Sequence, residues 1–229
     1  MGAGVVILDP ALSISTPEET WLASGVRSVD HCVEGICSLQ STKESDEAAK
    51  EGLRLLVPNL LKTKKNWEDE GPRLAEMKGV IEAMKVIGLG VQMGGSHGIG
   101  HQLGPLGVGH GQTSCVILPS VLKYNFKHGD EAIRSRQEKI LEIFWGDKTT
   151  AAVLKSHGLE KNKADGGDVV GAFVKELDLP SNLKDVGIKE SQLDALADSC
   201  LTDPWLKTNP IPLTEKRQVL EILKLALGP

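Results

Sequence analysis

A glycine-rich segment that contains three histidines constrains the fold of this chain more than any other feature. Residues 94–111 read Gly-Gly-Ser-His-Gly-Ile-Gly-His-Gln-Leu-Gly-Pro-Leu-Gly-Val-Gly-His-Gly. Ten of the 25 glycines of the chain lie between Gly88 and Gly111. Glycine weakens helices, so this density predicts that the backbone here passes close to other backbone or to a ligand.

The histidines of this segment indicate a functional site. His97 and His101 lie four residues apart, so they share one face of a helix. His110 follows a run of Gly and Pro that can fold back toward that face. His31 lies among apolar residues, so its imidazole either hydrogen-bonds internally or faces a cavity. Arg27 shares the helical face of His31 and either enters the same cavity or pairs with an acid at the surface.

Two acidic residues flank His31 in the sequence. Asp30 and Glu34 could orient an imidazole, but we interpret them as part of a solvated helix face. His128 and His157 lie near predicted helix ends, where a cation complements the helix dipole, so they are assigned no chemistry.

Composition and charge narrow the class of protein. The 229 residues are 40% hydrophobic and 25% charged, as in globular proteins, with a net charge of −5. We expect no nucleic-acid binding, because no basic stripe interleaves with aromatic residues, and no membrane span, because no apolar run is long enough. Residues 1–8 are too short for a signal peptide. The four cysteines have no paired spacing and predict reduced core thiols and a cytoplasmic location. They are Cys32, Cys37, Cys115 and Cys200.

Helical signals dominate the rest of the chain. Thr16-Pro17 followed by two acids predicts the start of a helix that continues to Ile36. Further helices are expected over residues 45–61, 74–89, 116–126, 131–145, 168–177, 190–201 and 214–227. Only residues 5–8, Val-Val-Ile-Leu, are typical of a strand. The sequence therefore predicts an all-α, multi-helix bundle. Residues 1–15 form a short strand and linker, and residues 16–229 form one helical, catalytic-type domain.

Two segments together resemble the iron-containing alcohol dehydrogenase family, and especially its maleylacetate-reductase-like branch. Residues 21–35 read Trp-Leu-Ala-Ser-Gly-Val-Arg-Ser-Val-Asp-His-Cys-Val-Glu-Gly. Residues 96–104 read Ser-His-Gly-Ile-Gly-His-Gln-Leu-Gly, followed by His110-Gly111 and Leu118-Pro119. The resemblance covers nearly the whole chain but only the C-terminal half of the family pattern. Residues 5–10 resemble the strand that precedes the helical domain in the family.

The resemblance implies a helical domain that, in the family, follows an NAD(P)-binding α/β domain. An Asp and three His of the helical domain typically hold Fe²⁺ or Zn²⁺ there, and His31, His97 and His110 match the three histidine positions. His101 matches a histidine that lies near the nicotinamide and the substrate.

Three departures from the family pattern bear on the cofactors. Arg27 stands at the position of the metal-binding Asp, and a guanidinium cannot ligate a metal and repels a dication. Relatives that reduce maleylacetate also lack this Asp. The spacing from His101 to His110 is one residue shorter than usual. These 229 residues contain no NAD(P)-binding domain, so no NAD(P) site is expected in this chain. A divalent metal, Fe or Zn, held by His31, His97 and His110 stays an alternative.

The main functional hypothesis is a truncated enzyme of this family that performs non-redox acid–base chemistry. Its substrate would be an anionic oxo or hydroxy small molecule. The reaction would be a dehydration, an isomerisation, a cyclisation, a decarboxylation or an aldol-type cleavage of that molecule. His97 and His101 would form the acid–base pair, and His31 and His110 would donate to an oxyanion. Arg27 would bind the anionic substrate through its two-pronged donor geometry.

Two alternatives belong to other classes. The first is an NAD(P)-dependent alcohol dehydrogenase or maleylacetate-reductase-type oxidoreductase whose cofactor domain comes from another polypeptide or lies outside this sequence. The second is an inactive helical interaction module. An exposed apolar wall where the cofactor domain would pack predicts a homodimer, which is compatible with the main hypothesis.

Overall fold

The computed structural model of the chain describes residues 4–228. The first three residues of the expected strand and linker (1–15) and the last residue of the expected helical domain (16–229) lie outside the described residues. Within residues 4–228 the fold consists of eleven α-helices and three short 3₁₀ helices, with no strand. The all-α prediction is therefore confirmed. The α-helices are α1 Pro10–Ser13, α2 Glu18–Cys37, α3 Lys43–Lys65, α4 Glu70–Gly88, α5 Gly95–Leu103, α6 His110–His128, α7 Glu131–Gly146, α8 Lys148–Ser156, α9 Gly166–Glu176, α10 Leu193–Cys200 and α11 Lys216–Leu227. The 3₁₀ helices are η1 Gly104–Leu106, η2 Glu190–Gln192 and η3 Pro204–Thr208.

The strand expected at residues 5–8 does not form. These residues have no regular secondary structure, and Val5 and Ile7 are 80% and 85% exposed. A strand needs a neighbour to pair its backbone N–H and C=O groups. No backbone hydrogen bond joins residues 4–8 to any other described residue, so the expectation was wrong for this chain.

Helix starts follow local capping chemistry. The side chain of Thr42 accepts a hydrogen bond from the N–H of Ser45 and begins α3 two residues before the predicted start. Pro17 is the residue before the first turn of α2 rather than within it. Asp147 caps α8, a helix that the sequence analysis did not predict because Gly146-Asp147 is typical of a turn.

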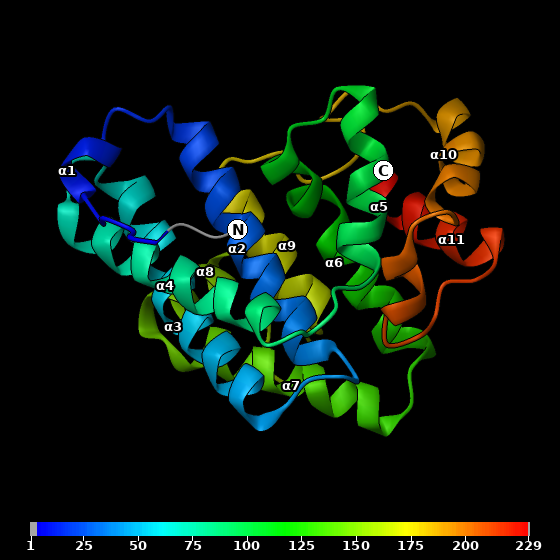
Figure 1. Ribbon diagram of the computed structural model, residues 1–229, viewed down its shortest axis with the longest axis horizontal. Helices are drawn as coiled ribbons and strands as arrows, with labels where there is room; N and C mark the ends of the chain where they lie inside the picture. The colour runs from blue at the N-terminus through cyan, green and yellow to red at the C-terminus, as the bar shows by residue number, and fades with distance from the viewer. Residues whose placement is uncertain (1–3, 229) are drawn as a thin grey trace.

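Helix α2 runs through the middle of the molecule (Figure 1). The buried apolar side chains form two hydrophobic cores. One core joins α2 to α3, α4 and α7–α9, and the other joins α5 and α6 to α10 and α11. Helix α6 contributes to both, with Cys115 and Leu118 in the first and Val116 and Ile117 in the second. The junction of α2, α5 and α6 is therefore held by packing on both sides.

The fold gives the burial of the four cysteines and the length and polarity of each described helix. The four cysteines are free and buried, as expected for reduced core thiols. Among the described residues, no helix combines the length and the apolar character that crossing a bilayer requires.

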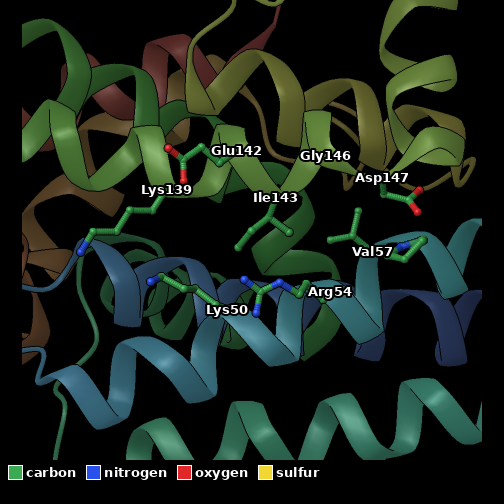
Figure 2. Close-up of a pocket in the computed structure, with 9 residues that line it drawn as sticks. Lys50, Arg54, Val57, Lys139, Glu142, Ile143, Gly146 and Asp147 are labelled. Carbon is green, nitrogen blue, oxygen red and sulfur yellow. The ribbon is translucent and has the colours of Figure 1, made fainter.

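A cleft of about 380 Å³ opens between α3 and α7 (Figure 2). Lys50 and Arg54 enter it from α3 and Lys139 from α7, with Ile143 between them. Each of these three basic side chains already lies within ion-pair distance of a nearby acidic side chain. The pairs are Lys50 with Glu47, Arg54 with Glu51 and Lys139 with Asp46. None of the histidines predicted to be functional lines this cleft.

Candidate active site

The histidine segment folds back on itself as its spacing predicts. His97 and His101 lie on α5, and His110 is the first residue of α6. Between the two helices, Gly107 adopts a φ of +89°, a conformation that favours glycine. This turn returns the chain so that α6 packs against α5 and α2.

Part of the glycine density permits close approach by other elements, whereas a Cβ atom at Gly88, Gly90, Gly104 or Gly107 would meet nothing within 4 Å. A Cβ atom at Gly98 would lie 2.3 Å from Cδ1 of Leu206 and 3.2 Å from Oδ1 of Asp203. A Cβ atom at Gly100 would lie 3.0 Å from Oγ1 of Thr113. Glycine at these positions lets η3 and α6 approach α5, which brings residues distant in sequence to the histidines.

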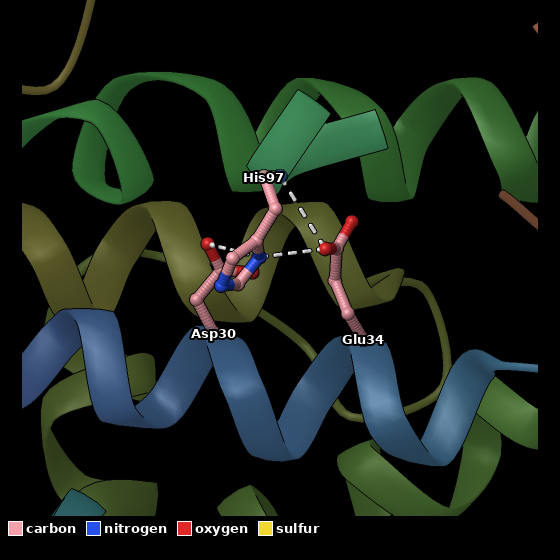
Figure 3. A group of neighbouring side chains, drawn as sticks. All are labelled: Asp30, Glu34 and His97. Carbon is pink, nitrogen blue, oxygen red and sulfur yellow. Dashed lines mark hydrogen bonds and ion pairs between the residues drawn. The ribbon is translucent and has the colours of Figure 1, made fainter. Parts of the chain in front are cut away.

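Glu34 fixes the first of the two α5 histidines. Its carboxylate, buried on α2, accepts hydrogen bonds from the backbone N–H of Gly94 at 2.9 Å and of Ser96 at 2.7 Å. It also accepts from Nδ1 of His97 at 2.8 Å (Figure 3). Burial opposes ionisation of Glu34, but the hydrogen bonds from His97, Gly94 and Ser96 bring its pKa below the usual value. Glu34 therefore acts as an anion at the start of α5 and holds His97 with its proton on Nδ1.

Asp30 forms a second buried anion beside His97. It is fully buried and accepts from Oγ of Ser96 at 2.8 Å and from Oγ of Ser114 at 2.6 Å. Arg27, only 6% exposed, places Nη1 3.0 Å from Oγ of Ser114 and 3.8 Å from Oδ2 of Asp30. The interpretation of Asp30 and Glu34 as a solvated face was wrong, because the chain of α5 and α6 covers this side of α2.

The remaining predicted histidines lie next to this cluster. The rings of His31 and His97 stack with centroids 4.7 Å apart. Burial, followed by the nearby His97 and Arg27, lowers the pKa of His31 to about 3. The partial desolvation of the His110 ring by neighbouring atoms, followed by the charges of Arg27 and His97, also lowers the pKa of His110. Both imidazoles are therefore neutral at neutral pH.

His101 has a carboxylate partner that the sequence analysis missed. Its Nδ1 lies 2.8 Å from Oδ2 of Asp203, which immediately precedes η3. The ring of Trp205, in η3, lies 5.0 Å from the ring of His101 and 5.5 Å from that of His97. The structure thus brings together all five predicted site residues and adds Glu34, Asp30, Asp203 and Trp205 to them.

The donor set does not fit a divalent ion held by three histidines. Within the described residues, the group whose ligand atoms lie within 4.8 Å of one another consists of Asp30, Glu34 and His97. Its carboxylates already accept hydrogen bonds from hydroxyl, backbone and imidazole donors, and the Arg27 guanidinium lies beside them. A dication bound there would displace these hydrogen bonds from the carboxylates, and the positive charge of Arg27 would repel it. His31 and His110 are not part of that group.

Two buried imidazole nitrogens have no partner, namely Nδ1 of His31 and Nε2 of His97. Buried polar atoms in native proteins are nearly always hydrogen-bonded, so unpaired ones mark a place where a polar ligand can bind. Exposure increases across the cluster, from His97 at 1% to the side chain of His101 at 37%. The cluster is therefore buried at His97 and accessible to solvent at His101.

The fold and the imidazole cluster define this chain as an all-α domain with a group of histidines at the junction of its helices. Residues 21–227 match the C-terminal part of the Fe-containing alcohol dehydrogenase family, and the chain belongs to that family. It is 46% identical to dehydrogenase ALT3 of Alternaria alternata over 98% of this chain and 61% of that protein. It is 40% identical to dehydrogenase FUM7 of Gibberella moniliformis over 99% of this chain and 55% of that protein.

Solved structures agree on the fold. A maleylacetate reductase from Rhizobium sp. strain MTP-10005 superimposes with a TM-score of 0.72 at 23% identity, over 96% of this chain and 55% of that one. A putative alcohol dehydrogenase from Ralstonia eutropha JMP134 gives 0.79 at 24% identity, over 96% and 56%. The chain thus spans little more than half the length of these proteins and of its sequence relatives.

Proposed function

We propose that this chain is the proton-transfer half of an NAD(P)-dependent oxidoreductase that interconverts the carbonyl and alcohol forms of a small anionic oxo or hydroxy compound. The observation that carries the proposal is the cluster of oriented imidazoles around a buried guanidinium. Dehydrogenase names among the relatives favour this oxidoreductase alternative over the non-redox lyase or isomerase hypothesis.

In this proposal the nicotinamide is held by a domain that the present sequence does not include. When bound, it supplies or accepts the hydride. His101 is the group that exchanges a proton with the substrate oxygen, because its Nδ1 is engaged by Asp203 and its ring is partly exposed. The neutral His31 and His110 donate N–H groups toward the same oxygen.

Arg27 supplies a fixed positive charge beside the substrate oxygen in this proposal. It stands where the family pattern has a metal-binding Asp, and it is buried against Ser114 and Asp30. Its Nε is buried without a partner, so the guanidinium retains a donor for an anion. A guanidinium in this position stabilises negative charge that develops on the substrate oxygen.

A complementation assay tests the proposal. The chain is mixed with the N-terminal half of the Alternaria alternata relative, made as a separate polypeptide, and consumption of NADH or NADPH is followed with oxo acids and with uncharged ketones of the same skeleton. We expect nucleotide consumption that requires both polypeptides and is faster for the acids. Arg27→Lys should raise KM for the acids, whereas Lys50→Gln, in the remote cleft, should leave it unchanged.

Two results would overturn the proposal. Conversion of an oxo acid by the chain alone, without consumption of nucleotide, would support the non-redox hypothesis. Formation of a stable complex with the N-terminal half that turns over no carbonyl compound would support the inactive interaction module.

A further inference from the structure

Imidazole–carboxylate pairs in this chain differ in the nitrogen that they use. At the candidate site, His97 and His101 each contact a carboxylate through Nδ1, at 2.8 Å. Away from the site, His128 and His157 contact carboxylates through Nε2, at 2.8 and 2.9 Å. Among these four carboxylate-paired histidines, His97 and His101 are therefore the two whose Nε2, the nitrogen farther from the backbone, is not used by the carboxylate and stays free for another group.

The His101 pair is built from two separate elements. Asp203 is 8% exposed and uses both carboxylate oxygens. Oδ1 accepts the backbone N–H of Trp205 at 2.9 Å and so caps η3, while Oδ2 faces Nδ1 of His101. Gly98 permits this approach, because a Cβ atom there would overlap Leu206 of η3. The cap on η3 thus fixes the position of Asp203 through a contact that does not involve the imidazole.

We propose that Asp203 is the positioning residue of His101, which it holds with the proton on Nδ1 and the Nε2 lone pair directed away from the protein. A carboxylate can only accept a hydrogen bond, so it selects this tautomer in the neutral ring. Trp205 packs against the same ring at 5.0 Å and restricts its rotation. The catalytic consequence rests on the proposed function, whereas the tautomer does not.

The proton balance of the proposed reaction follows from this geometry. In reduction, a nicotinamide bound by the cofactor domain would supply the hydride to the carbonyl carbon, and the carbonyl π electrons would move to oxygen. That oxygen takes the proton from Nε2 of the His101 imidazolium, which leaves a neutral ring with its proton on Nδ1. Nε2 is then reprotonated from solvent, to which the side chain is 37% exposed. Oxidation reverses each step.

Nitrogen NMR of the histidine side chains tests the positioning directly. In the wild-type chain we expect neutral His101 with Nδ1 protonated and Nε2 unprotonated. In Asp203→Asn, the side-chain oxygen can keep the cap on Trp205 while its NH₂ group donates to Nδ1, so we expect the proton on Nε2. Glu221→Gln, which alters the exposed His128 pair, is the matched control and should leave His101 unchanged.

The outcomes separate this inference from the proposed function. Wild-type His101 with its proton on Nε2, or an unchanged tautomer in a folded Asp203→Asn chain, would overturn the inference. If that variant does not fold, the wild-type tautomer alone decides. In the complementation assay we expect Asp203→Asn to lower kcat about 10- to 100-fold with little change in KM. A wild-type mixture with no activity would count against the proposed function while the tautomer still decides the inference.

Discussion

At the scale of single residues, the site is organised by three buried carboxylates, those of Asp30, Glu34 and Asp203, and by the buried guanidinium of Arg27. The imidazoles could be found from sequence because their spacing and their glycine context are local. Their partners could not, because Glu34 and His97 are 63 residues apart and Asp203 and His101 are 102 apart. No local sequence pattern distinguishes an acid that orients an imidazole from an acid on a solvated helix face. The packing of α5 and η3 against other elements determines which acids contact the imidazoles.

Arg27 should control the protonation of the neighbouring imidazoles. Its charge is among the causes that lower the pKa of His31 and of His110. In Arg27→Gln we therefore expect the pKa of His110 to rise toward its usual value, as measured by NMR titration. The same change leaves Asp30 buried without its cation, at a cost on the order of 3 kcal/mol in the free energy of unfolding. An unchanged His110 titration in the folded variant would contradict this electrostatic coupling, and Arg54→Gln is the surface control.

His31 should make the protein less stable in mild acid. Its pKa is about 3 in the folded chain and 6.5 in the unfolded reference. Between these values the unfolded chain binds a proton at His31 that the folded chain does not, so the free energy of unfolding falls as the pH falls from 6.5 toward 3. Above pH 6.5 His31 has no such effect.

Urea unfolding at several pH values measures this contribution. In His31→Asn we expect a shallower decrease of the unfolding free energy across that window than in the wild-type chain. His128→Asn, at an exposed position, should not flatten it. Equal slopes for the wild-type chain and His31→Asn would show that His31 is not desolvated as described.

At the scale of elements, the helices were largely predictable and their ends were not. The long amphipathic helices α2, α7 and α11 form where apolar periodicity predicted them. Helix α3 continues through Pro58 to Lys65, because the buried Leu56 and Leu60 hold it on both sides of the proline. The prediction of a strand at residues 5–8 was wrong, because the local sequence favours a strand but no described segment pairs with it through backbone hydrogen bonds.

The junction of α5 with η3 should depend on one glycine. In Gly98→Ala the new methyl group would overlap Leu206, and we expect a loss of roughly 1–3 kcal/mol in the free energy of unfolding, as for overpacking. Gly88→Ala is the matched control, because a Cβ atom there meets nothing within 4 Å and the residue lies in α4. It should be neutral or stabilising by about 0.4–1 kcal/mol. Thermal unfolding of both variants compares them, and equal melting temperatures would contradict close packing at Gly98.

At the scale of the whole molecule, an apolar surface lies beside the first described residues. A groove of about 270 Å³ is formed by side chains of the N-terminal segment, α2 and α4, among them Val6, Trp21 and Val80. Val5 and Ile7 project outward from the same segment. Proteins tend to cover apolar surfaces of this kind by association, so the homodimer predicted from the sequence stays a prediction for the chain in isolation.

Sedimentation over a range of concentrations tests this association. We expect the wild-type chain to form dimers and the double variant Val80→Glu and Ile81→Glu to shift toward monomers, because it places charges in the groove. Leu225→Glu, which alters an exposed leucine on α11, is the control and should leave the equilibrium unchanged. A wild-type chain that is monomeric at every concentration would refute the prediction.

The carboxylate of Glu34 couples the stability of the start of α5 to the position of the His97 imidazole. It accepts hydrogen bonds from the amides of Gly94 and Ser96 at the start of α5 and also holds His97, so fraying of that helix end also loosens the imidazole. The amides of Gly94 and Ser96 consequently serve as internal reporters, because their exchange with deuterium in D₂O measures the free energy of opening at the end of α5 that also frees the ring.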